Sequence, residues 1–144
     1  MNSDKTKHLE FLQSNIARMN QCSFQIKGWT ITIVSALLAI YASTIDGEGN
    51  GNVAYIFVGI APSLLFWMLD TYYLQLERKI RGIYNDVAEL NTEKDRIEVR
   101  DFEFPLNKYS TCKYCFIKVM WSKTEWPLYL SLIIGLIISG ILLL

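Results

Sequence analysis

The chain has 144 residues, of which 51% are hydrophobic, and its 14 Lys and Arg residues balance its 14 Asp and Glu residues. This hydrophobic fraction is high for a soluble domain of this length, and the neutral net charge says nothing about a charged partner. Charged side chains are missing from three runs, residues 28–45, 49–69 and 126–144. A helix needs about 20 apolar residues to cross a bilayer core of about 30 Å. The composition therefore argues against a soluble globule and predicts an all-α membrane protein with three transmembrane helices.

Residues 1–27 are predicted to form a cytoplasmic amphipathic helix. Ser3 or Asp4 is a suitable N-cap. Apolar residues follow at spacings of three, four and three, at Leu9, Leu12, Ile16 and Met19. This spacing places them on one face of the helix.

Residues 28–45 and 53–69 are predicted to form transmembrane helices 1 and 2. Core helices of a soluble bundle would carry a polar face, and TIVSALLAIYA has none. A cleaved signal peptide has a short leader, whereas 27 residues precede Gly28, so we expect an uncleaved anchor. The Gly-rich stretch DGEGNGN, residues 46–52, predicts a tight extracytoplasmic turn. It lacks the Lys and the Ser or Thr of a phosphate-binding loop.

The Lys and Arg residues predict the orientation of these spans. Four precede the first uncharged run, the other ten lie between Asp70 and Trp126, and the turn at 46–52 has none. Basic residues near membrane spans favour the cytoplasmic side. We therefore expect a cytoplasmic N-terminus and an extracytoplasmic C-terminus.

Residues 70–104 are predicted to form a cytoplasmic helical rod that continues the second span. Gly82 weakens this helix by about 1 kcal/mol relative to alanine. Apolar residues alternate at spacings of four and three and define a seam along one helix face: Leu69, Tyr73, Leu76, Ile80, Ile83, Val87 and Leu90.

A seam in water needs a partner, and the sequence leaves two alternatives. The N-terminal helix can cover it within one subunit, because both helices emerge on the same membrane face and neighbouring elements usually pair. Alternatively, rods from several subunits bundle together.

Small residues recur at every fourth position in each span. They are Ser35, Ala39 and Ser43 in the first, Gly59 and Ser63 in the second, and Ser131, Gly135 and Ser139 in the third. Such stripes let helix backbones approach closely in lipid. They predict helix packing within one chain or between copies, and hence favour a homo-oligomer.

Asp70 is an acid at the inner margin of the second span. One hypothesis makes it a gating carboxylate at a pore mouth, because ionisable groups at membrane depth are often functional. The other makes it a boundary acid that is solvated or paired with a lysine, and Lys27 lies at the matching depth on the first span. We favour the second, since the insertion cost applies mainly near the bilayer centre.

Residues 105–125 are predicted to form a cytoplasmic interfacial segment that leads into transmembrane helix 3, residues 126–144. Pro105 favours a break after the charged stretch NTEKDRIEVRDFEF, which could extend the rod or turn away from it. Four lysines then alternate with aromatic residues, a pattern that suits an anionic inner leaflet. Nucleic acid is not expected as a partner, because lysines beside a span need no such ligand.

The chain offers little to a metal, cofactor or catalytic site. Cys112 and Cys115 form CKYC, but only Cys22 and His8 could complete a zinc site, and the βαβ context of a thioredoxin motif is missing. We expect reduced structural thiols. With a single histidine and no paired-carboxylate site, an enzyme is not expected.

Two spans followed directly by a charged amphipathic helix, as in YIFVGIAPSLLFWMLDTYYLQLERKIRGIY, make the chain similar to the SLATT group of small bacterial membrane proteins. The resemblance covers roughly residues 25–90 and is one of pattern, and the third span departs from it. Members are thought to act as membrane-perturbing effectors in antiphage defence, triggered by a partner or a nucleotide signal. The resemblance implies a bacterial inner-membrane location and transfers no site residue.

Two functions follow as hypotheses. The first is a self-assembling membrane effector that forms a pore or perturbs the bilayer under control of its cytoplasmic helices. The second is a membrane anchor that scaffolds a soluble cytoplasmic partner through the exposed seam.

Overall fold

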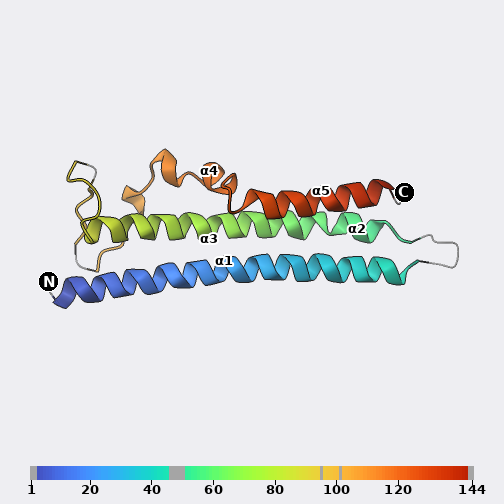
Figure 1. The fold of residues 1–144 in the computed structure, drawn as a ribbon, viewed down its shortest axis with the longest axis horizontal. Helices are drawn as coiled ribbons and strands as arrows, with labels where there is room; N and C mark the ends of the chain where they lie inside the picture. The colour runs from blue at the N-terminus through green and yellow to red at the C-terminus, as the bar shows by residue number, and fades with distance from the viewer. Residues whose placement is uncertain (1–2, 46–50, 95, 101, 143–144) are drawn as a thin grey trace. The chain divides into compact units, whose positions relative to one another are not determined.

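The computed structural model describes residues 3–45, 51–94, 96–100 and 102–142. Of these residues 77% are helical and none forms a strand. The elements in chain order are α1 (Ser3–Ser43), α2 (Ala54–Val58), α3 (Ile60–Val87), the 3₁₀ turns η1 (Leu106–Lys108) and η2 (Cys112–Tyr114), α4 (Phe116–Met120) and α5 (Trp126–Leu142) (Figure 1). The chain divides into two compact units: unit 1 comprises residues 1–23 and 72–119, and unit 2 comprises residues 24–71 and 120–144.

The single helix α1, Ser3–Ser43, runs through both the predicted amphipathic helix at 1–27 and the predicted span at 28–45, from residue 3 to residue 43. No proline lies in it, and Gly28 is the only glycine. One glycine costs a helix about 1 kcal/mol, which is too little to break 41 otherwise helical residues. The boundary predicted between residues 27 and 28 is therefore a change in composition, and the helix continues through it.

In unit 2, α5 packs along α2 and the beginning of α3 (Figure 1). The core of unit 2 contains Val34 and Tyr41 of α1, Ile56 of α2 and Leu136 of α5. Two glycines allow the helices to approach. A Cβ atom on Gly59 would lie 3.3 Å from Leu136 Cδ1, and one on Gly140 would lie 2.7 Å from the ring of Phe57.

The second apolar helix is interrupted at Gly59, between α2 and α3. Pro62 explains the interruption, because it has no N–H to donate to Val58 and its ring crowds that carbonyl. At the start of α2, the Asn52 side chain accepts a hydrogen bond from the Ala54 N–H at 3.1 Å, and the Asn52 N–H donates to Thr44 Oγ1 at 2.8 Å. Of the turn predicted at 46–52, positions 46–50 lie outside the described residues.

In unit 1, the N-terminal part of α1 covers the seam of α3. The buried core consists of Leu12, Ile80, Ile83, Tyr109 and Tyr114. Ile16, Met19, Leu76 and Val87 pack against this core, together with Ile97, Val99, Phe104 and Leu106 from the segment that follows α3. The chain thus brings the predicted leader face and the middle of the predicted seam together within one subunit.

The rod predicted over residues 70–104 is helical only as far as Val87. Glu89 adopts a left-handed backbone with φ of 60°. The Leu90 N–H donates to Asn85 O at 2.8 Å and the Glu89 N–H donates to Asp86 O at 3.2 Å, which is the Schellman pattern of a helix end. The helix therefore ends here, and Ile97, Val99, Phe104 and Leu106 of the following segment pack against the core that contains the seam.

The predicted interfacial segment at 105–125 contains the short elements η1, η2 and α4. Ile117 and Trp121 are exposed, as are the neighbouring lysines Lys118 and Lys123. Basic and apolar side chains therefore share the surface of this segment.

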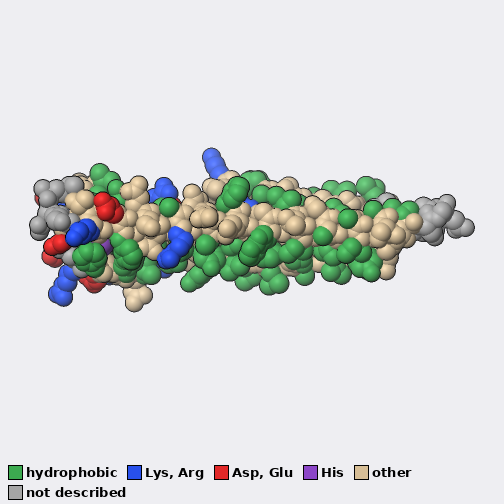
Figure 2. Space-filling model, turned by 90° about the horizontal axis from the view of Figure 1, so that it is seen from below, with side chains coloured by type: hydrophobic (Ala, Val, Ile, Leu, Met, Phe, Trp, Pro, Cys, Tyr) green, Lys and Arg blue, Asp and Glu red, His purple; other side chains and the backbone are tan. Residues whose placement is uncertain are grey.

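Two helical stretches are long and apolar enough to cross a membrane, by length and composition: Asp4–Ser43 and Ala54–Val87. The apolar helix α5 is shorter, with 17 residues. Only 17% and 33% of the most apolar windows of the two longer stretches are buried, whereas the core helix of a soluble protein is mostly buried. Hydrophobic side chains cover much of the visible face of unit 2, and charged side chains gather over unit 1 (Figure 2).

Candidate functional site

A cluster of charged side chains is buried in unit 2, where α1, α3 and the residues before α5 meet. Lys27 of α1 places its Nζ atom 2.5 Å from Asp70 Oδ2 and 2.8 Å from Glu125 Oε1. The Asp70 and Glu125 side chains are fully buried, and the Lys27 side chain is 18% exposed. One ammonium group therefore bridges two carboxyl groups that water does not reach.

A tyrosine completes the polar contacts of this cluster. Tyr129 lies one turn into α5, and its hydroxyl donates a hydrogen bond to Asp70 Oδ2 at 2.8 Å. Lys27, Asp70, Glu125 and Tyr129 are hereafter called the charge cluster. Because Lys27 and Tyr129 both contact Oδ2 of Asp70, the helices α1, α3 and α5 are joined at one carboxylate oxygen.

Aromatic rings surround the charge cluster. The Trp67 ring stacks on Tyr129 with centroids 6.0 Å apart and an interplanar angle of 11°, and it meets Trp121 edge-on at 5.9 Å. Trp67 lies three residues before Asp70 on α3, so the two share a helix face. Because the Asp70 and Glu125 side chains are fully buried, the local dielectric constant is lower than in water, which strengthens the charge interactions there.

The charges of the cluster do not balance when both acids are ionised, since one ammonium then faces two carboxylates. Asp70 Oδ1 and Glu125 Oε2 are buried without a hydrogen-bond partner in the described part of the chain. Burial, the largest cause, and the neighbouring Asp70 carboxylate raise the pKa of Glu125, Lys27 lowers it, and the net result is a pKa of about 7. Glu125 precedes the predicted third span and lies outside it.

The cluster contains more residues than the sequence predicted. The sequence predicts Asp70 at this boundary, with Lys27 as one alternative partner, and it does not predict the contacts of Glu125 and Tyr129. A signal existed for the three charges: Lys27 directly precedes the first uncharged run, Asp70 directly follows the second and Glu125 directly precedes the third. If three consecutive helices alternate in direction, the end of the first run's leader, the end of the second run and the start of the third run all lie at the same end of the helix bundle.

The predicted seam divides into buried and exposed residues. Ile80 and Ile83 are buried, Leu76 and Val87 pack against them, and Tyr73 is half-buried. Leu69 and Leu90, at the two ends, are 42% and 69% exposed. The structure therefore brings together only the middle of the predicted set.

Tyrosines from the segment after α3 lie against this seam. The Tyr109 hydroxyl donates a hydrogen bond to Asp86 Oδ2 at 2.5 Å, and Asn91 donates to the other oxygen of that carboxylate at 2.6 Å. Burial raises the pKa of Tyr109, and the bond to Asp86 raises it further. Both tyrosines of the core, Tyr109 and Tyr114, approach Gly82, where a side chain would collide with them.

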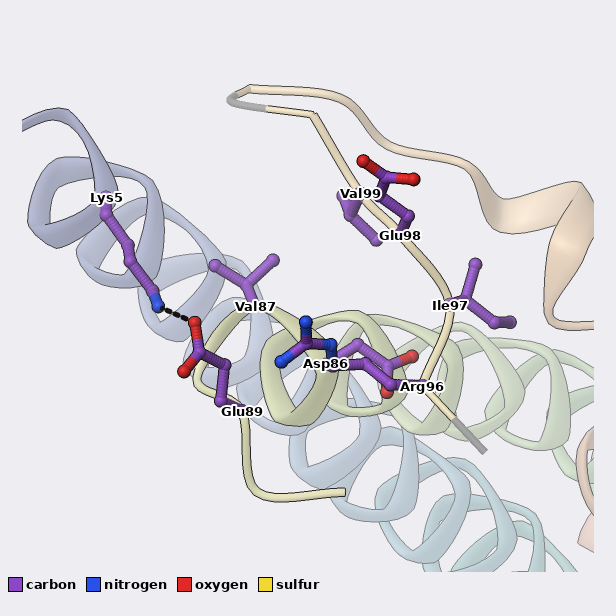
Figure 3. A pocket seen from close by; sticks show the side chains of 8 residues that line it. All are labelled: Lys5, Asp86, Val87, Glu89, Arg96, Ile97, Glu98 and Val99. Atoms are coloured by element: carbon purple, nitrogen blue, oxygen red, sulfur yellow. Dashed lines mark hydrogen bonds and ion pairs between the residues drawn. The ribbon is translucent and has the colours of Figure 1, made fainter. Parts of the chain in front are cut away.

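A pocket of about 200 Å³ lies beside this core in unit 1 (Figure 3). Lys5 forms an ion pair with Glu89 at 2.6 Å across its edge, and the hydrogen bond from Lys5 lowers the pKa of Glu89. The pocket is lined by two basic residues, Lys5 and Arg96, and by three acidic residues, Asp86, Glu89 and Glu98. Its apolar lining consists of Val87, Ile97 and Val99. This mixture gives no net positive field for a phosphate or another anion.

The small residues predicted to mediate packing occupy different environments. Gly59 and Ser63 are buried within the chain. Ser139 is half-buried, and the others are exposed: Ser35, Ala39, Ser43, Ser131 and Gly135. A Cβ atom on Gly135 would meet no atom within 4 Å. Gly140 of α5 was not in the predicted set. Unlike Gly135, it packs closely, because a Cβ atom there would lie 2.7 Å from the Phe57 ring.

The three cysteines are free thiols, with Cys112 and Cys115 exposed and Cys22 half-buried. No group of three or more His, Cys, Asp or Glu side chains in the described residues is placed to hold a metal ion.

Comparison of the chain with protein-family models, with curated proteins and with solved structures found no match.

Proposed function

We propose that this chain is a self-assembling, three-span protein of a bacterial inner membrane that perturbs the bilayer under control of its cytoplasmic unit. The observation that carries this proposal is the large apolar surface of unit 2. Trp29 is 61% exposed, Leu65 is 67% exposed and Ile141 is 63% exposed. Monomers in water rarely expose such continuous apolar patches, because each Å² left in contact with water costs about 25 cal/mol. A lipid environment removes this cost.

The third span is supported by the uncharged run at 126–144, of which α5 forms at least 17 residues. A helix of this length extends about 26 Å, close to the hydrocarbon thickness of about 30 Å, and the bilayer adapts to small mismatches. Lys27, Asp70 and Glu125 mark the cytoplasmic ends of the three spans in this arrangement. The positive-inside rule then places unit 1 in the cytoplasm and the C-terminus outside.

Self-assembly is supported by the small residues that the monomer leaves uncovered. Ala39 and Gly135 lie on exposed parts of α1 and α5, and the space beside Gly135 is open. Lipid provides no hydrophobic drive for helix association, so close backbone approach at small residues supplies the packing energy. Exposed Ser35, Ser43 and Ser131 lie in the same two stripes and extend this surface for a second copy.

The perturbing activity follows from the resemblance to the SLATT group, whose members are thought to act as effectors. The scaffold hypothesis depended on an exposed seam. Because the chain covers Ile80 and Ile83 with its own residues, a scaffold would need another surface to bind its partner.

The proposal predicts that the purified chain releases dye trapped in vesicles that contain anionic lipid, and that Gly135→Leu reduces this release. Leucine fits the monomer, because nothing lies near Gly135, but it overfills a contact between copies. Overpacking costs about 1–3 kcal/mol, so we expect release and cross-linked oligomers to fall roughly tenfold. Ala39→Leu tests the stripe of α1 in the same way.

Ile134→Leu is the matched control, since it changes the shape of a neighbouring exposed residue and keeps its volume. It is expected to release dye like the unchanged chain. If the chain inserts stably and causes neither dye release nor loss of membrane potential, the perturbing function is excluded. Cross-linking that is identical in the unchanged chain and in Gly135→Leu would exclude assembly through this stripe.

A further inference from the structure

We propose that the charge cluster is a proton-binding site, in which Asp70 and Glu125 hold one exchangeable proton between them while Lys27 bridges their other oxygens. This inference goes beyond the proposed function, because the site binds its proton whether or not the assembly permeabilises lipid.

The contacts of the four carboxylate oxygens carry the inference. Lys27 occupies Asp70 Oδ2 and Glu125 Oε1, and Tyr129 also donates to Oδ2. The two remaining oxygens, Asp70 Oδ1 and Glu125 Oε2, are buried and have no donor in the described part of the chain. An acceptor buried without a donor is costly, and an ionised one is more so.

A single proton between the two carboxyl groups provides both of these oxygens with a hydrogen-bond partner. Bound to one carboxyl group, it makes an O–H that can donate to the other carboxylate, because the single ammonium group of Lys27 holds the two carboxyl groups beside each other, at 2.5 Å from Asp70 Oδ2 and 2.8 Å from Glu125 Oε1. The formal charge of the cluster then changes from −1 to 0. Paired carboxyl groups at short range share protons in this way, because two like charges in a dry site do not both ionise readily.

The surroundings favour a proton over other cations. The charged and titratable groups that face Glu125 are Lys27 from α1, Asp70 from α3 and Tyr129 from α5. The ammonium group of Lys27 already occupies the position between the carboxylates that a metal ion would take. A further cation would also need oxygen ligands, of which the cluster offers only two without partners.

The surroundings of Glu125 also determine how readily it gives up a proton. Burial, followed by the neighbouring Asp70 carboxylate, raises the pKa of Glu125 to about 7. Loss of the proton leaves an excess negative charge next to α5, where the Trp67 and Tyr129 rings provide little screening. Proton release is therefore expected to weaken the contact between α5 and α3 at this end of unit 2.

Infrared spectroscopy of the full chain in lipid nanodiscs tests the site directly. A protonated carboxyl group has a C=O band that ionised carboxylates lack, and ¹³C-labelled glutamate shifts that band. We expect a glutamic acid band with a midpoint of about pH 7. Glu125→Gln is expected to remove the band, and Glu93→Gln, a change at an exposed glutamate, is expected to keep it.

Asp70→Asn provides a second variant. It removes the neighbouring negative charge, so the proton affinity of Glu125 should fall about tenfold or more, seen as a midpoint lower by about one pH unit or more. A band midpoint in the unchanged chain near the ordinary glutamate value of 4.5 would overturn the proposal, whether or not any variant folds. A band near pH 7 that persists in folded Glu125→Gln would overturn it as well.

Discussion

Gly82 lies in the middle of α3, where helix propensity alone favours alanine by about 1 kcal/mol. The structure favours glycine instead, because an alanine side chain at this position would collide with two tyrosines. A Cβ atom at Gly82 would lie 2.6 Å from the Tyr114 hydroxyl and 2.9 Å from Tyr109 Cδ1. Both tyrosines belong to the buried core of unit 1, so neither ring can move away without disturbing its neighbours. The glycine is required by close packing of rings against the helix.

We therefore predict that Gly82→Ala destabilises unit 1 by about 1–3 kcal/mol, the usual cost of overpacking. Gly28→Ala is the matched control, because Gly28 is also helical and a Cβ atom there would meet nothing within 4 Å. Thermal denaturation followed by circular dichroism measures both variants. Equal melting temperatures for the two would show that the tyrosines do not pack against Gly82 as described.

At the scale of elements, the seam of α3 shows how far periodicity predicts packing. We predict that Ile83→Asp lowers the free energy of unfolding by about 3 kcal/mol or more, because it buries an unpaired charge among apolar side chains. Leu90→Asp is the matched control, since Leu90 has the same place in the predicted periodicity but is 69% exposed.

The control variant should change stability by less than about 0.5 kcal/mol, as surface substitutions usually do. Limited proteolysis of unit 1 and thermal melting measure the difference. Similar losses in both variants would contradict the division of the seam into a buried middle and exposed ends.

Four-three spacing depends only on helix geometry, so the sequence could indicate that residues such as Ile80 and Ile83 share one face of α3. It could not predict the end of α3. The residue at the left-handed position is Glu89, whereas a glycine is the residue that usually marks such a helix end, and the hydrogen bonds that close the end run from Glu89 and Leu90 back to Asp86 and Asn85. The contacts of Tyr109 and Ile97 with the core join residues distant in sequence, and no local pattern indicates them.

At the scale of the whole molecule, composition predicted an all-helical protein with three spans. The described residues confirm the helical class and contain two helical stretches long and apolar enough to cross a membrane. The sequence also placed Lys27, Asp70 and Glu125 at the edges of uncharged runs. It did not predict their contact, because the rotation of each helix about its axis depends on packing between helices. Tyr129 reaches Asp70 only because α5 turns that residue inward, where its side chain is fully buried.

The charge cluster also makes stability depend on pH. A carboxyl group whose pKa is higher in the folded chain keeps its proton where the unfolded chain has lost it, so the folded state binds more protons and stability falls as pH rises. For Glu125 this window extends from about 4.5 to about 7. Its contribution is fully present below the window and fully lost above it.

We predict that Glu125→Gln removes this part of the pH dependence, because its neutral amide resembles the protonated acid. The stability of the variant relative to the unchanged chain should rise between about pH 4.5 and pH 7 and stay constant above that. Taking the difference cancels the contributions of carboxyl groups that both chains share. Melting temperatures in detergent across this range measure it, with Glu93→Gln as the surface control. Parallel pH profiles for Glu125→Gln and the unchanged chain would mean that Glu125 does not carry the proton in the folded state.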